Sequence, residues 1–253
     1  MENTYTEIQS MQRAIDVLEL IAESKSPISI KDIIVATKLP KPTVYRLLSN
    51  WIARNYVSRN SDGKYTLGLR LFSMGRQIDP LLAMKPIVKP FLQRLNNEFN
   101  ETVHLGMLHE NKVQYVDGIE SRNAIRMVMT IGSTGFVHCT SLGKALLMSA
   151  NEEVIRKILC QASMKKLTVH TITDVDEFIK AIEVAKIDGY ALDMQEGDDD
   201  CCCIGAPIYD VKGMVIAAIS VSGPCSRMTL ATIKEDIAPL LVKTTKEISG
   251  LLG

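Results

Sequence analysis

The spacing of apolar residues over the first 67 positions constrains the fold of this chain more than any other feature. Three successive segments there carry apolar residues at a helical spacing, and they are interrupted at Lys25-Ser26-Pro27 and at Leu39-Pro40-Lys41-Pro42. Because proline disfavours a helical conformation of the residue before it, both interruptions predict turns. The pattern therefore predicts a bundle of three short helices at the start of the chain.

Hydroxyl residues mark the places where the first two helices are expected to begin. Ser10 can cap the first helix, and Ser29, with Asp32 three positions later, is a capping signal for the second. The apolar positions of the first helix that follow the helical period and should face the core are Met11, Ala14, Ile15, Leu18 and Ala22.

The third helix separates its side chains by chemistry. Its apolar residues follow the 3.6-residue period and are expected in the core: Val44, Leu47, Leu48, Trp51 and Ile52. The opposite face carries donors that suit DNA phosphates and base edges: Lys41, Thr43, Tyr45, Arg46, Ser49 and Asn50. Two short strand patterns follow at 56–59 and 64–67, joined through Asp62-Gly63, which is a strong hairpin signal. Three helices and a hairpin predict a winged helix-turn-helix.

The distribution of charge supports a DNA-binding interpretation. The chain carries 29 basic and 29 acidic residues, yet residues 25–70 contain nine Lys or Arg and only two acids, a local net charge of +7. This block coincides with the outer face of the third helix and with the hairpin. Two of its nine basic residues, Arg59 and Lys64, belong to the hairpin. The alternatives are a solvated face of uneven charge and a helical interaction module that binds no nucleic acid.

The remaining sequence predicts a second domain. A connecting helix is expected from Gly68 to Pro80, and the predicted limits are 1–68 for the DNA-binding domain, 69–84 for the linker helix and 85–253 for the second domain. From Thr102 the apolar period changes to two, as in strands. Strands are expected at 103–107, 112–119, 126–131, 190–195, 202–208 and 214–222, and helices at 85–97, 140–148, 152–161, 174–187 and 229–252. This mixture indicates an α+β domain with an antiparallel sheet.

No catalytic or metal-binding motif occurs with the required spacing. The chain lacks a Walker A loop, a glycine-rich dinucleotide motif, an H-E-x-x-H helix and a G-x-S-x-G elbow. Cys201-Cys202-Cys203 follows three aspartates, but neighbouring residues of a strand point to opposite faces, so the three thiols cannot converge on one ion. We therefore expect neither a metal nor a cofactor.

The cellular compartment is predicted from what the chain contains and lacks. Six cysteines in 253 residues suit a reducing compartment. No apolar run approaches the ~20 residues of a membrane span, and the N-terminus carries no signal pattern. We expect a cytoplasmic protein without a membrane segment.

A small anion pocket is the remaining candidate site of the second domain. Ser220 and Ser222 lie on one face of a predicted strand, where apolar side chains would otherwise pack. Thr140 is a natural N-cap, which leaves the backbone N–H groups of Ser141 and Leu142 free for a carboxylate. The alternative for the two serines is a hydrogen-bonded polar pair of an edge strand.

Several motifs in a fixed order resemble the isocitrate-lyase-regulator (IclR) family of bacterial transcription regulators over the whole chain. They are Ser10-Met-Gln-Arg-Ala-Ile-Asp-Val-Leu, Pro42-Thr-Val-Tyr-Arg-Leu-Leu, Gly63-Lys-Tyr-Thr-Leu-Gly-Leu-Arg-Leu, His138-Cys-Thr-Ser-Leu-Gly-Lys-Ala-Leu-Leu, Asp188-Gly-Tyr and Ala217-Ala-Ile-Ser-Val-Ser-Gly-Pro. The resemblance implies a winged helix-turn-helix, a linker helix used in dimer formation and a GAF-like effector domain. It also implies homodimers, or tetramers of two dimers, on palindromic double-stranded operators, usually as repressors.

The resemblance also implies an effector site. Transferred position by position, the family's pocket falls on the backbone of Ser141 and Leu142 and on Asp193, Cys203, Ser220 and Ser222, with Met127 as an apolar wall. Thr102-Val-His-Leu-Gly-Met-Leu together with Arg126-Met resembles the 2-keto-3-deoxygluconate regulator branch, which senses sugar acids.

The leading hypothesis is a sequence-specific DNA-binding repressor controlled by a small carboxylate or sugar acid. A first alternative is an enzyme acting on a small oxo or hydroxy acid, for which Asp193 and Cys203 are the only candidate pair, with no histidine placed beside them by a motif. A second alternative is a DNA-binding protein that responds to no effector. A polar pocket built from separated segments argues against that alternative, because an inert core is better filled with apolar side chains.

Overall fold

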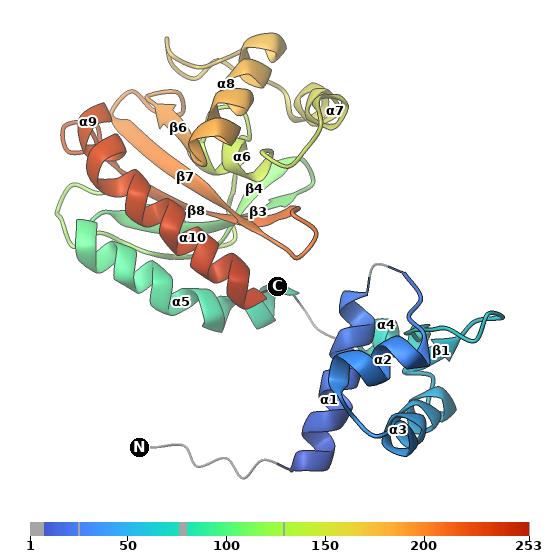
Figure 1. Cartoon of the computed structure of the whole chain (residues 1–253). Helices are drawn as coiled ribbons and strands as arrows, with labels where there is room; N and C mark the ends of the chain where they lie inside the picture. Colours follow the sequence, from blue (N-terminus) through green and yellow to red (C-terminus); the bar gives the residue numbers. More distant parts are fainter. Residues whose placement is uncertain (1–7, 25, 76–79, 129, 253) are drawn as a thin grey trace. The chain divides into compact units, whose positions relative to one another are not determined.

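The chain forms two compact units, Met1–Asp79 and Pro80–Gly253 (Figure 1). The computed structural model describes residues 8–24, 26–75, 80–128 and 130–252, without the side chains of 75 and 80–82. Within these ranges, no helix has the length and apolar character needed to cross a membrane.

The first unit is a winged helix-turn-helix, as predicted. Its elements are α1 (Gln9–Glu23), α2 (Ile30–Thr37), α3 (Lys41–Ala53), the antiparallel strands β1 (Val57–Arg59) and β2 (Tyr65–Leu67), and α4 (Leu69–Gly75). The core between the helices and the hairpin contains Val17, Ile21, Ile33, Val44, Leu48, Val57 and Tyr65. A bridge between Ile28 and Tyr65 joins the hairpin to the segment before α2. The expected cap of α2 is present, since the Ser29 hydroxyl accepts a hydrogen bond from the Asp32 N–H at 3.3 Å.

Helix α1 differs from its prediction. It begins at Gln9 after Ile8, without a side-chain cap, so Ser10 lies inside the helix. The buried residues are Val17 and Ile21, whereas Met11 is 61% exposed and Ile15 is also exposed. The apolar period predicted one continuous buried face, but the small core covers only the C-terminal half of α1. For the same reason Ile52, at the end of α3, is exposed.

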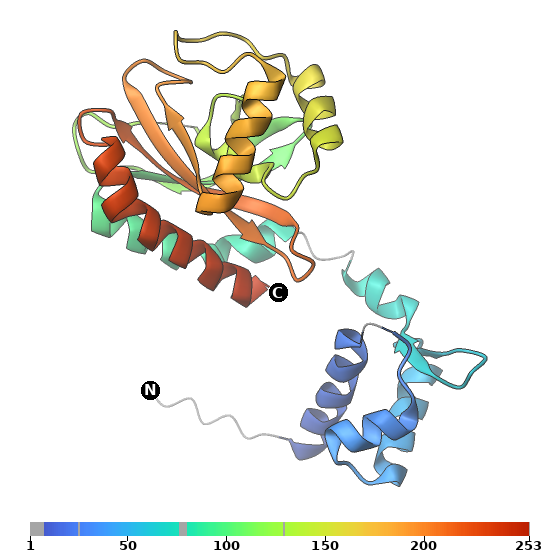
Figure 2. The ribbon, with the colours of Figure 1, turned by 45° about the horizontal axis from the view of Figure 1, so that its top comes forward.

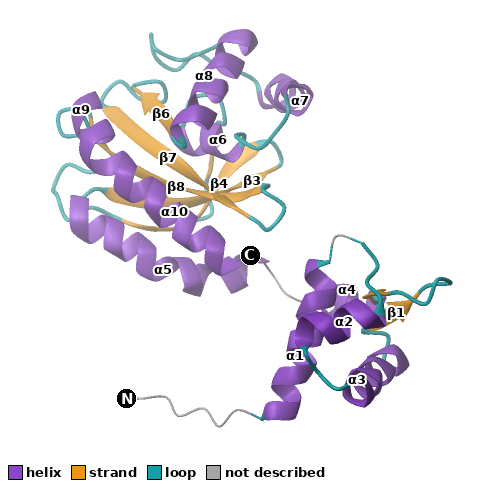
Figure 3. Ribbon diagram, viewed as in Figure 1, coloured by secondary structure: helices purple, strands orange, loops and turns teal. Residues whose placement is uncertain are grey.

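The second unit is built on a six-stranded antiparallel sheet (Figure 3). Its strands lie in the order β5 (Thr134–Gly135), β4 (Lys112–Ile119), β3 (Thr102–His109), β8 (Val215–Pro224), β7 (Cys201–Tyr209) and β6 (Ala191–Met194). Helices α5 (Pro80–Phe99) and α10 (Ala238–Leu252) lie side by side on one face (Figure 2). The other face carries α6 (Ser141–Leu146), α7 (Glu152–Ala162) and α8 (Val175–Asp188). The predicted fold class is confirmed.

Two separate cores fill the space on either side of this sheet. Leu92, Ile204 and Leu241 belong to the core beneath α5 and α10. Leu142 and Phe178 belong to the core beneath α6, α7 and α8. Alternate residues of the central strands therefore serve different cores, as the period of two requires.

Two predicted elements of this unit were wrong in detail. The strand expected at 126–131 is absent from the described residues of that segment, and β5 pairs with β4 instead. The Met127 carbonyl accepts a hydrogen bond from the Thr102 hydroxyl at 2.7 Å, and Gly132 turns the chain with a φ of +89°. The final helix is preceded by α9 (Leu230–Thr232) and a π-helical turn, Ile233–Ile237.

Pro80 begins α5 rather than ending a connecting helix. A proline is well accepted in the first turn of a helix because its missing N–H would have no partner there. Helix α4 ends at Gly75, and residues 76–79 lie outside the described part of the chain. The limits 69–84 for the linker, and those of the two domains, stay predictions.

Candidate functional site

The first candidate site is the outer surface of α3 and the hairpin, which we call the basic face. The predicted donors there are exposed, except for the half-buried Thr43: Lys41, Tyr45, Arg46, Ser49, Asn50, Arg59 and Lys64. The ion pairs among the described residues include none of these cations. Their charges are therefore available to an external polyanion.

Aromatic rings and backbone carbonyls orient several side chains of the basic face. The Lys41 ammonium lies 5.8 Å from the centre of the Tyr45 ring, and the Arg59 guanidinium lies 5.7 Å from that of Tyr65. The Asn50 amide donates to the Arg46 carbonyl at 2.8 Å, which directs it along the helix.

Two residues of α1 adjoin the basic face and were missed by the sequence reasoning. Ser10 and Arg13 line one depression together with Thr43 and Arg46. Arg13 precedes the basic block at 25–70, so the local charge count did not include it.

The second candidate site is a cavity of about 250 Å³ between the sheet and α6. Every residue predicted for the effector site lines it: Met127, Ser141, Leu142, Asp193, Cys203, Ser220 and Ser222. The first and last of these residues, Met127 and Ser222, are 95 positions apart, so the cavity brings together distant segments of the sequence.

The register of the sheet explains this convergence. Asp193 of β6 lies opposite Cys203 of β7, which lies opposite Ser222 of β8. One row further along the strands, Ser220 of β8 lies opposite His104 of β3. Because directly opposed residues share a face, these side chains form two adjacent rows on the floor of the cavity.

The start of α6 forms the opposite wall. The Thr140 hydroxyl accepts a hydrogen bond from the Gly143 N–H at 3.1 Å, as predicted for an N-cap. The N–H groups of Ser141 and Leu142 have no hydrogen-bond acceptor among the described residues. A Cβ on Gly205 would lie 2.7 Å from the Ser141 carbonyl oxygen, so only glycine allows α6 to approach the sheet this closely.

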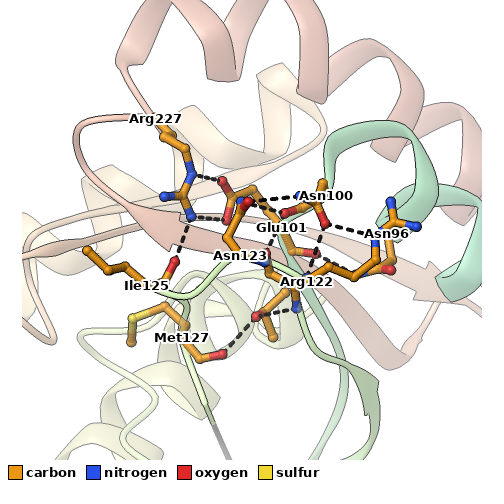
Figure 4. Close-up of polar contacts among 10 residues, drawn as sticks. Asn96, Asn100, Glu101, Arg122, Asn123, Ile125, Met127 and Arg227 are labelled. Carbon is orange, nitrogen blue, oxygen red and sulfur yellow. Dashed lines mark hydrogen bonds and ion pairs between the residues drawn. The ribbon is translucent and has the colours of Figure 1, made fainter.

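A network of polar contacts holds the segment that carries Met127 (Figure 4). Arg227 forms an ion pair with Glu101, and its Nη2 also donates to the Ile125 carbonyl at 3.0 Å. The Thr102 hydroxyl donates to the Met127 carbonyl at 2.7 Å. These contacts place the Met127 side chain at the cavity wall, although the described residues on either side of it form no helix or strand.

Asp193 is the central ionisable group of the cavity. It is 4% exposed, and its Oδ1 accepts hydrogen bonds from the N–H groups of Glu196 at 2.8 Å and Gly197 at 3.4 Å. Burial raises the pKa of Asp193 to about 7, and the nearby Glu196 charge also raises it, while these hydrogen bonds and the Lys144 charge oppose the rise. Near neutral pH the carboxyl therefore exists in both protonation states.

A buried ion pair lies behind the cavity. Lys144 of α6 donates to Glu196 and also to the Leu192 carbonyl at 2.8 Å, and both charged side chains are buried. The Glu196 Oε2 has no hydrogen-bond partner within the described part of the chain, and burial raises the pKa of this carboxyl. The sequence reasoning missed this pair, although a lysine among the small and apolar residues of 141–146 was an available signal.

The cysteines alternate between the two faces of β7, as predicted. Cys201 and Cys203 line the cavity with their sulfur atoms 3.4 Å apart, whereas Cys202 lies in the core beneath α5 and α10. The hydrogen bond with Cys201, together with burial, raises the pKa of the Cys203 thiol well above its usual value. The thiol is therefore protonated at neutral pH and is a poor nucleophile. Among the described residues, no group of three or more His, Cys, Asp or Glu is placed to hold a metal ion.

Two family models match most of the chain. The model of the IclR helix-turn-helix domain matches residues 10–61, and the model of the bacterial transcriptional regulator IclR C-terminal domain matches residues 82–250.

Relatives and solved structures agree with these matches. The chain is 30% identical over 247 residues to the HTH-type transcriptional regulator KdgR of Dickeya chrysanthemi, and the match covers 97% of this chain and 80% of that protein. It is 32% identical over 246 residues to the HTH-type transcriptional repressor AllR of Escherichia coli K12, and this match covers 97% of this chain and 90% of that protein. A crystal structure of an IclR homologue from Microbacterium hydrocarbonoxydans, complexed with 4-hydroxybenzoate, matches with a TM-score of 0.59 at 23% identity and covers 96% of this chain and 98% of its own.

Proposed function

Because this chain belongs to the IclR family of bacterial transcriptional regulators, we propose that it is a repressor whose operator affinity is controlled by a small carboxylate or sugar acid. Its curated relatives are transcriptional regulators and repressors, so the chain is a regulator and not an enzyme. The observation that carries the proposal is the contrast between an exposed basic face, whose cations form no ion pair among the described residues, and a partly enclosed cavity whose mainly apolar walls hold a few polar groups.

Operator DNA binds to the basic face in this proposal. Helix α3 enters the major groove, where Arg46, Ser49 and Asn50 meet base edges and Tyr45 and Thr43 lie beside the backbone. Lys41, together with Arg59 and Lys64 of the hairpin, contacts phosphates and supplies affinity that depends on salt. The exposure of these side chains and the absence of ion pairs at the described cations support this assignment.

The effector binds in the cavity. Its carboxylate accepts hydrogen bonds from the N–H groups of Ser141 and Leu142 and from the hydroxyl groups of Ser220 and Ser222. Asp193, when protonated, donates a hydrogen bond to the acid, and Met127 and Cys203 complete the walls. The 4-hydroxybenzoate in the homologue's crystal structure is also a carboxylate, which supports an acid as the ligand class.

The regulator acts as a homodimer, or as a tetramer of two dimers, on a palindromic operator in the cytoplasm. Helix α4 leaves Leu69 80% exposed and Met74 exposed, and apolar side chains of this kind favour association between subunits. The effector changes operator affinity only if it binds one arrangement of the subunits better than another.

The experiment that tests the proposal measures DNA binding and ligand binding together. Operator fragments are first selected from genomic DNA by retention on the purified protein. Operator affinity and thermal stability are then measured with millimolar pyruvate, glyoxylate, aldonic acids and 2-keto-3-deoxy sugar acids. A ligand at 100 times its dissociation constant stabilises a protein by about 2.7 kcal/mol, which a thermal scan detects.

The wild type is compared with Ser220→Ala/Ser222→Ala and with a matched control, Ser163→Ala/Ser226→Ala, at two exposed serines. We expect at least one acid to stabilise the wild type and the control, and to change their operator affinity, but not to affect the cavity variant. The proposal is wrong if no acid changes either quantity, or if the cavity variant responds like the wild type.

A further inference from the structure

The side chains of Cys201 and Cys203, which we call the thiol pair, lie together on the floor of the cavity. Their sulfur atoms are 3.4 Å apart, both residues are buried, and both line the cavity. They are two positions apart on β7, so both point to the same face of the sheet, while Cys202 between them lies in the core on the other face. The proposed acid site uses Cys203 only as a wall and gives Cys201 no role.

The backbone of β7 hinders closure of the thiol pair into a disulfide. At about 3.3–3.4 Å per residue, Cα atoms two positions apart in a strand are about 6.7 Å apart. This distance is at the upper end of the range of roughly 4.4–6.8 Å found in disulfides, and the sulfur atoms would have to approach by about 1.3 Å. Strands β6 and β8 hold β7 on both sides and oppose such a movement. A single atom that bridges the two sulfurs needs no such approach.

The bridging atom has to be one that binds sulfur and is satisfied by two protein ligands. Structural Zn²⁺ takes four ligands, and among the described residues no group of three or more His, Cys, Asp or Glu is placed to hold a metal ion. A trivalent arsenic atom that already carries one organic group needs only two sulfurs. With bonds of about 2.3 Å, as in zinc thiolates, and angles of about 90–110°, two bridged sulfurs are about 3.3–3.8 Å apart. The observed 3.4 Å lies within this range.

An organoarsenic(III) oxide, R–As=O, joins two thiols by condensation. Two As–S bonds form while two S–H bonds and the As=O bond break, and both thiol protons leave with the oxygen as one molecule of water. Arsenic stays trivalent, so the step needs neither an oxidant nor a reductant. Because the protons pass to the leaving oxygen, no free thiolate has to exist beforehand. This suits Cys203, since the hydrogen bond with Cys201, together with burial, holds the pKa of its thiol well above the usual value.

The rest of the cavity suits an aryl group on the arsenic atom. Its walls are mainly apolar and include Met127, Phe136 and Leu142. The Tyr115 ring also lines it, packs edge to face on His104 with ring centres 5.3 Å apart, and interacts electrostatically with Cys203, so this wall adjoins the thiol pair. The volume of about 250 Å³ exceeds the roughly 150 Å³ of an apolar protein cavity that binds benzene.

We propose that the thiol pair is a reversible covalent site for monosubstituted trivalent arsenic compounds, with the organic group in the apolar part of the cavity. This second class of ligand is independent of the proposed acid, because the arsenic atom needs only the two sulfurs and not the N–H groups of α6. Cys203 lies in one row with Asp193 and Ser222, so a bound arsenical occupies part of the space proposed for the acid.

The test adds phenylarsine oxide to the reduced full-length protein and measures the intact mass. The treated protein is then exposed to excess 2-mercaptoethanol, which has one thiol, or 2,3-dimercaptopropanol, which has two. A bridge between two protein sulfurs resists a monothiol, because a broken As–S bond closes again at a high effective concentration. The variants are Cys201→Ala and Cys203→Ala. The matched controls are Cys160→Ala, at an exposed cysteine, and Cys225→Ala, which removes the partner of Cys202 on the other face.

We expect the wild type to retain one phenylarsenic group per chain in 2-mercaptoethanol and to lose it to 2,3-dimercaptopropanol. Cys201→Ala and Cys203→Ala should each lower the retained amount at least tenfold, whereas the two controls retain it. A second measurement does not depend on the folding of a variant. After denaturation of the treated wild type, iodoacetamide should label four of the six cysteines and leave only Cys201 and Cys203 unlabelled.

Three results would each overturn the inference: a wild type that retains no phenylarsenic group in 2-mercaptoethanol, a Cys201→Ala protein that retains as much as the wild type, or protection of any other pair of cysteines from iodoacetamide. None of these measurements involves DNA or an acid. Failure of the thiol pair therefore leaves acid control of the regulator standing, and failure of acid control leaves the thiol pair standing.

Discussion

The two units of this protein arrange their functional residues in opposite ways. On the basic face, the cations are exposed and form no ion pairs among the described residues. In the second unit, Lys144 is buried and paired with Glu196, and the described residues that line the cavity beside it include no lysine or arginine. A polyanion is attracted through water by many accessible charges. A small ligand is instead selected by a few buried polar groups left without protein partners. The comparison predicts that the exposed charges of the first unit serve DNA binding, whereas the buried Lys144–Glu196 pair stabilises the fold of the second unit.

Removing the buried cation tests the second half of this comparison and has the largest expected effect. Lys144→Met leaves the Glu196 carboxylate buried without its cation, which costs about 3–5 kcal/mol of stability. Chemical denaturation of the second unit measures the loss. Lys243→Met, at an exposed lysine of α10, is the control and should change stability by less than about 0.5 kcal/mol. Lys144→Met/Glu196→Leu should recover most of the loss, and a stable Lys144→Met protein would contradict the structural role of the pair.

Reversing an exposed charge tests whether the cations of the basic face serve DNA binding. Arg46→Glu should weaken operator binding at least ~100-fold, or about 2.7 kcal/mol, because a carboxylate replaces a donor at the DNA surface. The melting temperature should not change, since the Arg46 side chain is exposed. Lys243→Glu makes the same change of charge on the second unit and should retain operator affinity. Electrophoretic retention of the selected operator measures the effect, and normal binding by Arg46→Glu would remove this residue from the interface.

A methyl group between α6 and the sheet should disturb the cavity without any change of charge. In Gly205→Ala the new Cβ would lie 2.7 Å from the Ser141 carbonyl oxygen, so the backbone of α6 must move. We expect a loss of about 1–3 kcal/mol in stability, with weaker acid binding. Gly250→Ala is the matched control, because a Cβ there has no neighbour within 4 Å. Thermal unfolding measures the stability of the two variants, and calorimetry measures their acid binding. If the two variants have equal stability and equal acid affinity, the close approach of α6 to the sheet is not required for the cavity.

The raised pKa of Asp193 predicts how acid binding depends on pH. A bound carboxylate repels ionised Asp193, so binding favours the protonated form and takes up a proton wherever the unliganded group is ionised. Affinity for a monocarboxylic acid should thus be constant below about pH 7 and fall by up to tenfold, or about 1.4 kcal/mol, per pH unit above it. Asp193→Asn should remove this dependence. Calorimetry between pH 6 and pH 9 provides the measurement, and an affinity that rises with pH would contradict the assignment.

The sequence allowed part of the cavity to be predicted from the residues alone. Ser220 and Ser222 followed from the strand period, and Ser141 and Leu142 from the cap at Thr140. Asp193, Cys203 and Met127 required the resemblance to a family, because nothing in their local sequence indicates a common site. The structure brings all seven around one cavity, and their role in binding an effector stays a prediction.

His104, Tyr115 and the Lys144–Glu196 pair were not predicted at all. His104 and Tyr115 lie in strands whose two faces are both buried. The sequence therefore does not indicate which face of the sheet each of these side chains occupies. The β-bulge between Leu105 and Gly106 shifts the pairing of β3 with β4 just before the Gly106–Tyr115 pair, and such a shift cannot be read from the strand period.

The sequence by itself determined the three helices and hairpin of the first unit, the basic face and the caps at Ser29 and Thr140. These features depend on residues within a turn or two of each other, so local spacing, proline and capping chemistry are sufficient. Only the tertiary structure decided how much of α1 is buried, which residues share the cavity floor and which charges are paired. Those outcomes depend on strand register, which places Thr102 opposite Ser222, 120 positions away, and on the approach of α6 to the sheet at Gly205.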